Sequence, residues 1–244
     1  DNLWQREHSA SFQFLTAPQD PSGLRVFSGS YVMPVNTSGD ALAFYTVTSN
    51  SSVTALGTIN VIGKGSITGA RYIIALPGRG SYYHTLSLGI DSKDFKESQR
   101  LGSDTTETPI SYVPVSAEYR VNVAGAKRTH SGSMGLYTAP RSFFGNNEEE
   151  FARKRFGARS NYLYARGDWL TEQRLSARTV VRARLAGQLA SQPLISSEQF
   201  AAGGADTVRG YLEIERLADQ GVVGAMVPVA SIASAAQVRA CIEV

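Results

Sequence analysis

The chain has 244 residues and a formal net charge of only +3 at pH 7, which gives no reason to expect a nucleic-acid partner. Its single cysteine, Cys241, excludes an internal disulfide framework and a cysteine-based zinc site. No apolar run approaches the roughly 18 residues of a transmembrane helix, so a β-barrel is the only membrane-spanning option left. The chain begins at Asp1 without a signal segment, and we expect a mature chain or a fragment.

The first half of the chain predicts strands, because apolar and polar residues alternate between clusters of Gly, Pro, Asn and Ser. The expected ranges are about 8–16, 24–33, 41–49, 66–76 and 81–93. In the last range an apolar face and a polar face separate clearly. The alternating residues are His84, Leu86, Leu88 and Ile90 against Thr85, Ser87, Asp91 and Lys93.

The second half continues the pattern, with strands expected at 115–123, 128–138, 151–165 and 175–189. The clearest is 115–123, where Val115, Ala117, Tyr119, Val121 and Val123 alternate with Ser116, Glu118, Arg120 and Asn122. No stretch has a sustained helical period of apolar residues. We therefore expect an all-β chain with about nine strands before residue 193.

Arginines gather on one face of two expected strands. They are Arg153, Arg155 and Arg159 in 151–165, and Arg178, Arg182 and Arg184 in 175–189. One interpretation is a cationic barrel lumen that holds an unfolded polar substrate. The other is an ordinary polar interior face, in which arginines meet acidic residues such as Glu118 on neighbouring strands.

The connections are of two kinds, which alternate along the chain. Short turns are expected at 77–80 and 124–127, and longer polar links at 50–65, 95–108 and 139–149. Outer-membrane barrels have short periplasmic turns and long extracellular loops. Counting along the chain places the connection 193–220 among the long, external ones.

Strand length favours a membrane barrel over a soluble fold. Several segments reach a dozen residues, whereas soluble strands usually have about 5–6 and tilted membrane strands about 9–11. A soluble β-sandwich acting as a binding module remains an alternative at this point.

The stretch from Pro193 to Glu215 departs from the repetitive strand pattern. Glu198-Gln199-Phe200 precedes the pair Gly203-Gly204, and Val208-Arg209-Gly210-Tyr211 follows. In this order and spacing the stretch resembles the extracellular-loop segment of the two-partner secretion transporters, the TpsB or ShlB/FhaC/HecB haemolysin secretion/activation family. In that family the segment folds back into a transmembrane β-barrel.

The resemblance extends from Asp1 to about Val227, through stretches such as 84–91, 150–155 and 185–188. It implies an antiparallel, sixteen-stranded barrel in the bacterial outer membrane, of which we expect this chain to cover an incomplete part. We assign residues 1–227 to this partial barrel and leave 228–244 unassigned, because the strand pattern is lost from Ala225 onward. The family's POTRA domains and plug helix have no counterpart in the chain.

The resemblance also implies a function and a set of site residues. The function is secretion, with or without activation, of a large haemolysin- or adhesin-type exoprotein through the outer membrane. An outer-membrane insertase of the BamA type is the nearest alternative. The motif residues expected in the re-entrant loop are Gly203, Gly204, Val208, Arg209, Gly210 and Tyr211. In the family, the arginine that matches Arg209 points inward and pairs with an aspartate of a later strand.

Catalytic and metal sites are not expected. His8, His84 and His130 have no metal-ligand spacing, and the cluster Glu148-Glu149-Glu150 lies in a polar link. No glycine-rich phosphate loop leads from a strand into a helix. We therefore expect no enzyme activity and no cofactor, with an exoprotein and outer-membrane lipid as the partners.

Overall fold

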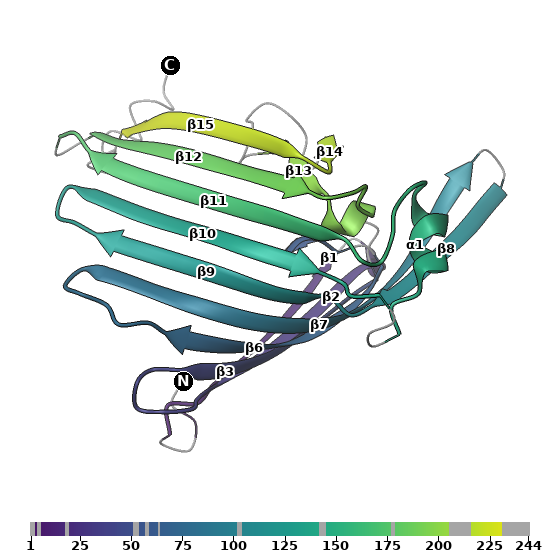
Figure 1. Cartoon of the computed structure of the whole chain (residues 1–244), viewed down its shortest axis with the longest axis horizontal. Coiled ribbons are helices and arrows are strands. Elements are labelled where there is room, and N and C mark those ends of the chain that lie inside the picture. Colours follow the sequence, from purple (N-terminus) through teal and green to yellow (C-terminus); the bar gives the residue numbers. More distant parts are fainter. Residues whose placement is uncertain are drawn as a thin grey trace.

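The computed structural model describes residues 3, 6–17, 20–50, 54–56, 59–62, 64–101, 104–141, 145–176, 179–204 and 216–230. Most of them belong to one antiparallel sheet of 11 strands (Figure 1). Its strands are β1 (Ser9–Ala17), β2 (Asp20–Pro34), β3 (Ala41–Ser49), β6 (Gly65–Ala75), β7 (Tyr82–Leu101), β8 (Asp104–Tyr112), β9 (Val115–Ala124), β10 (Arg128–Thr138), β11 (Leu163–Arg174), β12 (Thr179–Ala190) and β15 (Gly221–Ala230).

Smaller elements complete the described fold. Two short hairpin sheets are formed by β4 (Thr54–Leu56) with β5 (Ile59–Ile62), and by β13 (Phe200–Ala202) with β14 (Arg216–Ala218). The helices are α1 (Glu148–Lys154) and the 3-10 turn η1 (Ser196–Glu198). No helix in the described ranges is long and apolar enough to cross a bilayer.

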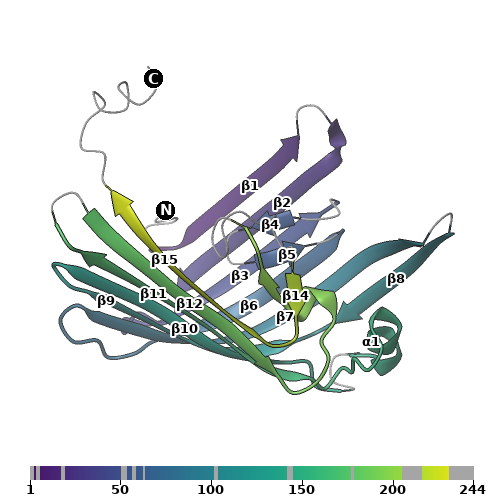
Figure 2. The ribbon, with the colours of Figure 1, turned by 90° about the horizontal axis from the view of Figure 1, so that it is seen from above.

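The large sheet is a deeply curved trough. Strands pair in the order β1-β2-β3-β6-β7-β9-β10-β11-β12-β15, and β8 extends the pairing along the far part of β7. Figure 2 shows β1 and β2 on one arm of the trough and β11, β12 and β15 on the other. In the described residues β1 and β15 do not pair with each other. The expected incomplete antiparallel barrel is therefore the fold observed.

The convex face of the trough carries the apolar side chains. Phe12 is 75% exposed, Leu189 67% and Met226 74%, and each alternates with residues that face the concave side. The concave side of the sheet carries Ser11, Gln13, Arg71, Asp91, Glu118, Arg120 and Arg166. The alternation predicted for 66–76, 81–93 and 115–123 is confirmed, as is the part of 175–189 from Thr179 onward. The alternative of a β-sandwich, in which two sheets pack across a dry core, is therefore wrong for this chain.

The connections sort by the end of the sheet at which they lie. The end with the short turns 35–40, 76–81, 125–127 and 175–178 is called the turn end, and the opposite end is called the loop end. At the loop end the chain has the long connections 50–64, 139–162 and 191–220, although only two residues separate β1 from β2 there. The predicted distinction between short and long connections is thus confirmed.

One of the predicted links is in fact strand. Residues 95–108 are not a polar loop, because β7 runs for 20 residues and pairs first with β9 and then with β8. The hairpin of β7 and β8 projects beyond the neighbouring strands (Figure 1).

The strand expected at 151–165 is wrong. Residues 148–154 form α1, where the side chain of Asn147 accepts a hydrogen bond from the backbone N–H of Glu149 and Phe151 is buried. Three glutamates occupy the first turn, and Arg153 and Lys154 the last, which suits the helix dipole. The neighbouring strand is β11, which begins at Leu163, so Arg153, Arg155 and Arg159 do not form a row on a strand face.

The loss of strand pattern expected from Ala225 onward is also wrong. Strand β15 continues to Ala230 and pairs with β12 from Gly221 to Ala230. Its concave side carries Val223, Ala225 and Val227, so both faces are apolar or small and the alternation of polarity disappears. Residues 231–244 lie outside the described part of the chain.

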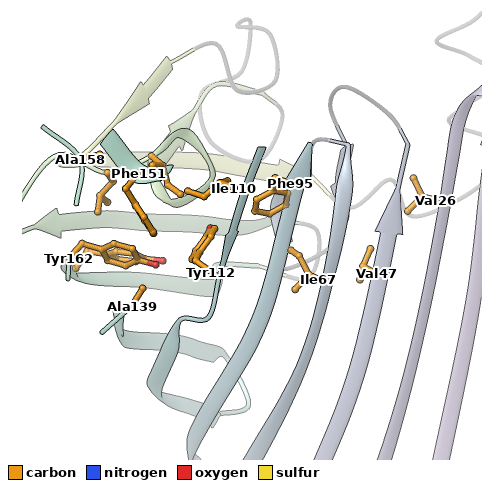
Figure 3. Close-up of a cluster of buried hydrophobic side chains, with 13 residues drawn as sticks. Val26, Val47, Ile67, Phe95, Ile110, Tyr112, Ala139, Phe151, Ala158 and Tyr162 are labelled. Carbon is orange, nitrogen blue, oxygen red and sulfur yellow. The ribbon is translucent and has the colours of Figure 1, made fainter. Parts of the chain in front are cut away.

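The buried apolar cluster lies at the loop end (Figure 3). It joins the ends of several strands, through Val26, Val47, Ile67 and Phe95, to the structures that cover them. Phe151 of α1 meets the ring of Tyr112 edge-on at 5.3 Å between centroids. This packing holds α1 and the long connections against the sheet.

Halfway along the concave wall, glycines make room for a braced ion pair. The Arg71 guanidinium donates to Asp91 Oδ1 at 2.7 Å and to Asp91 Oδ2 at 2.8 Å, and also to the hydroxyl of Tyr45 at 2.7 Å. A Cβ on Gly69 would lie 2.2 Å from Asp91 Oδ1, and one on Gly89 would lie 2.5 Å from Arg71 Nη1. The absence of side chains at both positions therefore permits the pair.

Substituting Gly69→Ala should destabilise the fold by about 1–3 kcal/mol, because the new methyl group overlaps the ion pair. Urea unfolding of the refolded protein in detergent, followed by tryptophan fluorescence, measures the change. Gly224→Ala is the matched control, since its Cβ would have no neighbour closer than 3.8 Å. Equal stability of the two variants would contradict the prediction.

Candidate functional site

The candidate site is the concave wall together with the connection 191–220 that folds back onto it. A cavity of about 560 Å³ lies there, between the wall and residues Ser197–Gln199. Its lining mixes polar side chains, such as Arg71 and Glu118, with apolar ones, such as Val47 and Ile67.

The charges of the concave wall neutralise one another. Arg182 Nη2 of β12 lies 2.5 Å from Glu172 Oε1 of β11, and Arg184 Nε of β12 lies 2.7 Å from Asp168 Oδ2 of β11. Arg120 pairs with Glu118 along β9. The inward arginines at 182 and 184 therefore belong to ion-pair ladders between neighbouring strands rather than to an uncompensated cationic surface. Arg178 lies outside the described residues.

The deepest contact between the connection and the wall is made by Glu198 of η1. Its side chain is 2% exposed and accepts hydrogen bonds from Lys93 Nζ at 2.5 Å, Tyr112 Oη at 2.6 Å and Tyr164 Oη at 2.7 Å. These donors come from β7, β8 and β11. A buried carboxylate is tolerated only when it is paired and hydrogen-bonded, and here both oxygens are satisfied.

Electrostatics keep Glu198 ionised. Burial alone would raise the pKa of its carboxyl group, but the Lys93 ammonium and the hydrogen bonds from Lys93, Tyr112 and Tyr164 outweigh burial and lower that pKa. The backbone of the same residue is also held. Its carbonyl oxygen accepts from Arg166 Nη2 at 3.2 Å and from Gln188 Nε2 at 3.1 Å. Both the side chain and the backbone of Glu198 are thus fixed to the wall.

A second anchor closes the base of the connection. Arg155 Nη1 donates to the Leu194 carbonyl at 2.7 Å and to Asp219 Oδ1 at 2.5 Å, so one guanidinium holds both the entering and the leaving segment of the connection. Asp219 Oδ1 also accepts from the Leu194 backbone N–H and from Gln199 Nε2, both at 3.0 Å. Burial would raise the pKa of Asp219, but these donors lower it.

The stems of the connection pair above these anchors. Phe200 of β13 lies opposite Ala218 of β14 in the short antiparallel sheet. Gly203 and Gly204 follow with φ values of +117° and +97°, a backbone conformation that residues with a Cβ rarely adopt. The predicted motif residues Val208, Arg209, Gly210 and Tyr211 lie outside the described residues.

Sequence reasoning missed the two anchors. Glu198 was predicted only as part of the Glu198-Gln199-Phe200 stretch, and Lys93 only as one residue of a polar strand face. Lys93 and Glu198 are 105 positions apart, and nothing in a single sequence pairs them. Arg155 was assigned to a row on a strand, whereas it clamps both stems of the connection.

Removing the charge of Glu198 should loosen the connection. Glu198→Gln leaves the Lys93 ammonium buried without its counter-charge, which costs about 3–5 kcal/mol in buried pairs. A spin label on Ala201→Cys, in a Cys241→Ser background, should become mobile in this variant. The double variant Lys93→Met/Glu198→Gln should recover part of the order, because no unpaired charge remains.

The exposed pair of Arg153 and Glu149 supplies the control, since Glu149→Gln should change label mobility little. A label that stays immobile in Glu198→Gln would show that this carboxylate does not anchor the connection.

Acid should release the same contacts. Glu198 and Asp219 have folded-state pKa values below their ordinary values of 4.5 and 3.8. Such carboxylates stabilise the fold fully above their ordinary pKa, and the stabilisation is lost as the pH falls through the lower folded value. The label at position 201 should therefore stay immobile down to about pH 5 and become mobile below about pH 4. A rise in mobility between about pH 7 and pH 5 would contradict this assignment.

Comparison with known proteins agrees with the geometry. The sequence model of the haemolysin secretion/activation protein family ShlB/FhaC/HecB matches residues 28–224, which is most of the chain and includes the anchored connection. None of the curated proteins matches. The family is one of transporters, and its outer-membrane location agrees with a strand-rich, curved sheet whose apolar side chains face outward. The chain belongs to the ShlB/FhaC/HecB family of haemolysin secretion/activation proteins.

Proposed function

We propose that this chain forms part of the wall of an outer-membrane pore that secretes a large exoprotein of the haemolysin or adhesin type. In this proposal residues 1–227, together with the end of β15, are barrel wall, and the connection 193–220 is the re-entrant loop. The partners are the exoprotein and the lipid of the outer membrane. The export needs no catalysis by this chain, because folding of the exoprotein outside the cell draws it through.

The observation that carries the proposal is the division of one sheet into two opposite surfaces. Outward side chains such as Leu185 and Val222 are exposed although they are apolar, which is costly in water and favourable against hydrocarbon. Inward side chains of the same strands are polar and ion-paired. A strand with this distribution fits a lipid-facing wall around an aqueous interior.

The anchored connection supports a resting, obstructed state of the pore. Glu198 and Asp219 hold both stems of the connection at the concave wall, and Ser197–Gln199 line the cavity. We propose that residues 200–215 occupy the conduit at rest and that their displacement opens it. In this scheme Arg209 supplies an inward charge in the loop, with Val208, Gly210 and Tyr211 beside it, and Gly203 and Gly204 allow the loop to turn.

The arginines have separate roles in the proposal. Arg178, Arg182 and Arg184 line the lumen, and the pairs of Arg182 and Arg184 with acidic residues support this for the last two. Arg155 holds the loop base instead. Arg153 and Arg159, both exposed, lie on and after α1 at the loop end.

Deleting the gene from its source cells should remove one large protein from the culture medium and leave it inside the cell envelope. The complete gene should restore secretion, whereas the variants Glu198→Gln and Arg209→Ala should reduce it about tenfold or more, because both disturb the resting loop. Mass spectrometry of the medium measures the effect.

Arg153→Ala is the control, since that exposed side chain forms only a surface ion pair. Unchanged secretion by an otherwise intact Arg209→Ala transporter would rule out a required role for Arg209. A medium unchanged by deletion of the gene would refute the proposed function itself.

A further inference from the structure

The concave wall is divided into a charged part and a neutral part. From β6 to β12 the inward side chains include ten charged residues: Arg71, Asp91, Lys93, Glu118, Arg120, Arg166, Asp168, Glu172, Arg182 and Arg184. On β1, β2 and β3, none of the inward side chains that the structure describes is charged. They are small, hydroxyl-bearing, amide or apolar groups, among them Ser11, Gln13, Ser28 and Ser30.

The described residues of the re-entrant connection make their polar contacts with the charged part. Its polar contacts reach Lys93 on β7, Tyr164 and Arg166 on β11, and Gln188 on β12. In the described ranges, no hydrogen bond or ion pair joins the connection to β1, β2 or β3. The cavity of about 560 Å³ therefore has Ser197–Gln199 on one side and the neutral wall on the other.

The neutral wall keeps unused hydrogen-bonding capacity. Ser28 Oγ makes one long bond to Gln13 Oε1 at 3.5 Å, and the hydroxyls of Ser11 and Ser30 have no intramolecular partner among the described residues. The charged groups that also line the cavity are already satisfied, as in the Arg71–Asp91 and Arg120–Glu118 pairs. A polar ligand in the cavity could therefore form hydrogen bonds with free donors and acceptors of the neutral wall.

An extended polypeptide matches this surface. Its backbone presents an N–H donor and a C=O acceptor at every residue, about 3.3 Å apart along the strand, and all of them need partners or water. A serine hydroxyl both donates and accepts, so a wall of serines can exchange partners as a backbone moves past it. A neutral wall also gives no strong ion pair that would hold a charged side chain in place.

We propose that the neutral wall of β1 and β2, centred on Ser11, Gln13, Ser28 and Ser30, is the surface along which the extended backbone of the exported chain moves. This inference rests on the proposed function and names the surface that the cargo contacts. In this proposal the charged wall holds the re-entrant connection, and the neutral wall contacts the exported chain.

The test uses the full-length transporter in detergent and a synthetic, uncharged, fluorescent 20-residue peptide rich in Ser, Thr and Asn as the probe. A photoreactive amino acid replaces Ser11, Ser28 or Ser30 in turn, and Phe12 on the convex face or Arg182 on the charged wall for comparison. Cross-links should form from positions 11, 28 and 30 and be several-fold weaker from 12 and 182. The double variant Ser28→Ala/Ser30→Ala should weaken peptide binding about tenfold, which corresponds to ~1.4 kcal/mol.

Ser92→Ala is the matched control, because Ser92 is an exposed serine on the opposite face of β7 from Asp91 and Lys93. Cross-links chiefly from position 182, equal binding by the double variant and the control, or no cross-link at all would each overturn the inference. Secretion by the same full-length transporter, assayed in the source cells, tests the proposed function separately. If secretion is intact and any of these results is obtained, the proposed function as a pore stands, and only the role of the neutral wall as the contact surface for the exported chain is refuted.

Discussion

The two-fold period of side chains along each strand is the constraint on which the rest of this structure depends. Along most long strands of the main sheet, apolar groups such as Phe14 and Met134 turn to the convex side and polar groups turn to the concave side, whereas both faces of β15 are apolar or small. Backbone hydrogen bonds between neighbouring strands are satisfied within the sheet. A surface of this kind is stable where hydrocarbon meets it from outside and water fills its interior.

The polar interior is what allows a charged segment to fold back inside. Burying Glu198 in an apolar core would cost several kcal/mol, but the concave wall supplies Lys93, Tyr112 and Tyr164 as donors. At neutral pH the attachment of η1 depends on a few charge-assisted contacts, whereas the base of the connection is packed through Leu194 and Ile195 in the apolar cluster. Such an anchor holds the segment in one place and can be released when its few partners are taken away.

Several parts of the fold could be predicted from the sequence because local pattern determines them. Strict alternation, as at 115–123, predicted the strands and which side chains share a face of the sheet. The contrast between short and long connections predicted which connections lie at the same end of the sheet. The spacing of Arg153, Arg155 and Arg159 resembles the same alternation and led to the wrong prediction of a strand at 151–165. Asn147 followed by three glutamates is a helix-start signal. Strand β11 was missed because Gly167 and the inward Leu170 interrupt its pattern. The anchors of the connection depend on distant residues and had no local signal.

The most direct test of the account is the environment of successive residues along one strand. Single spin labels at positions 183 to 189 of β12, in the full-length protein reconstituted in lipid bilayers, can be probed with dissolved oxygen and with a water-soluble nickel complex. Labels at the odd-numbered positions, such as Leu185 and Leu189, should collide mainly with oxygen. The label at Arg184 should collide mainly with the nickel complex, and labels at the buried positions Ala186 and Gln188 should collide little with either reagent. Accessibility that does not alternate along the strand would contradict a lipid-facing outside and a water-filled inside.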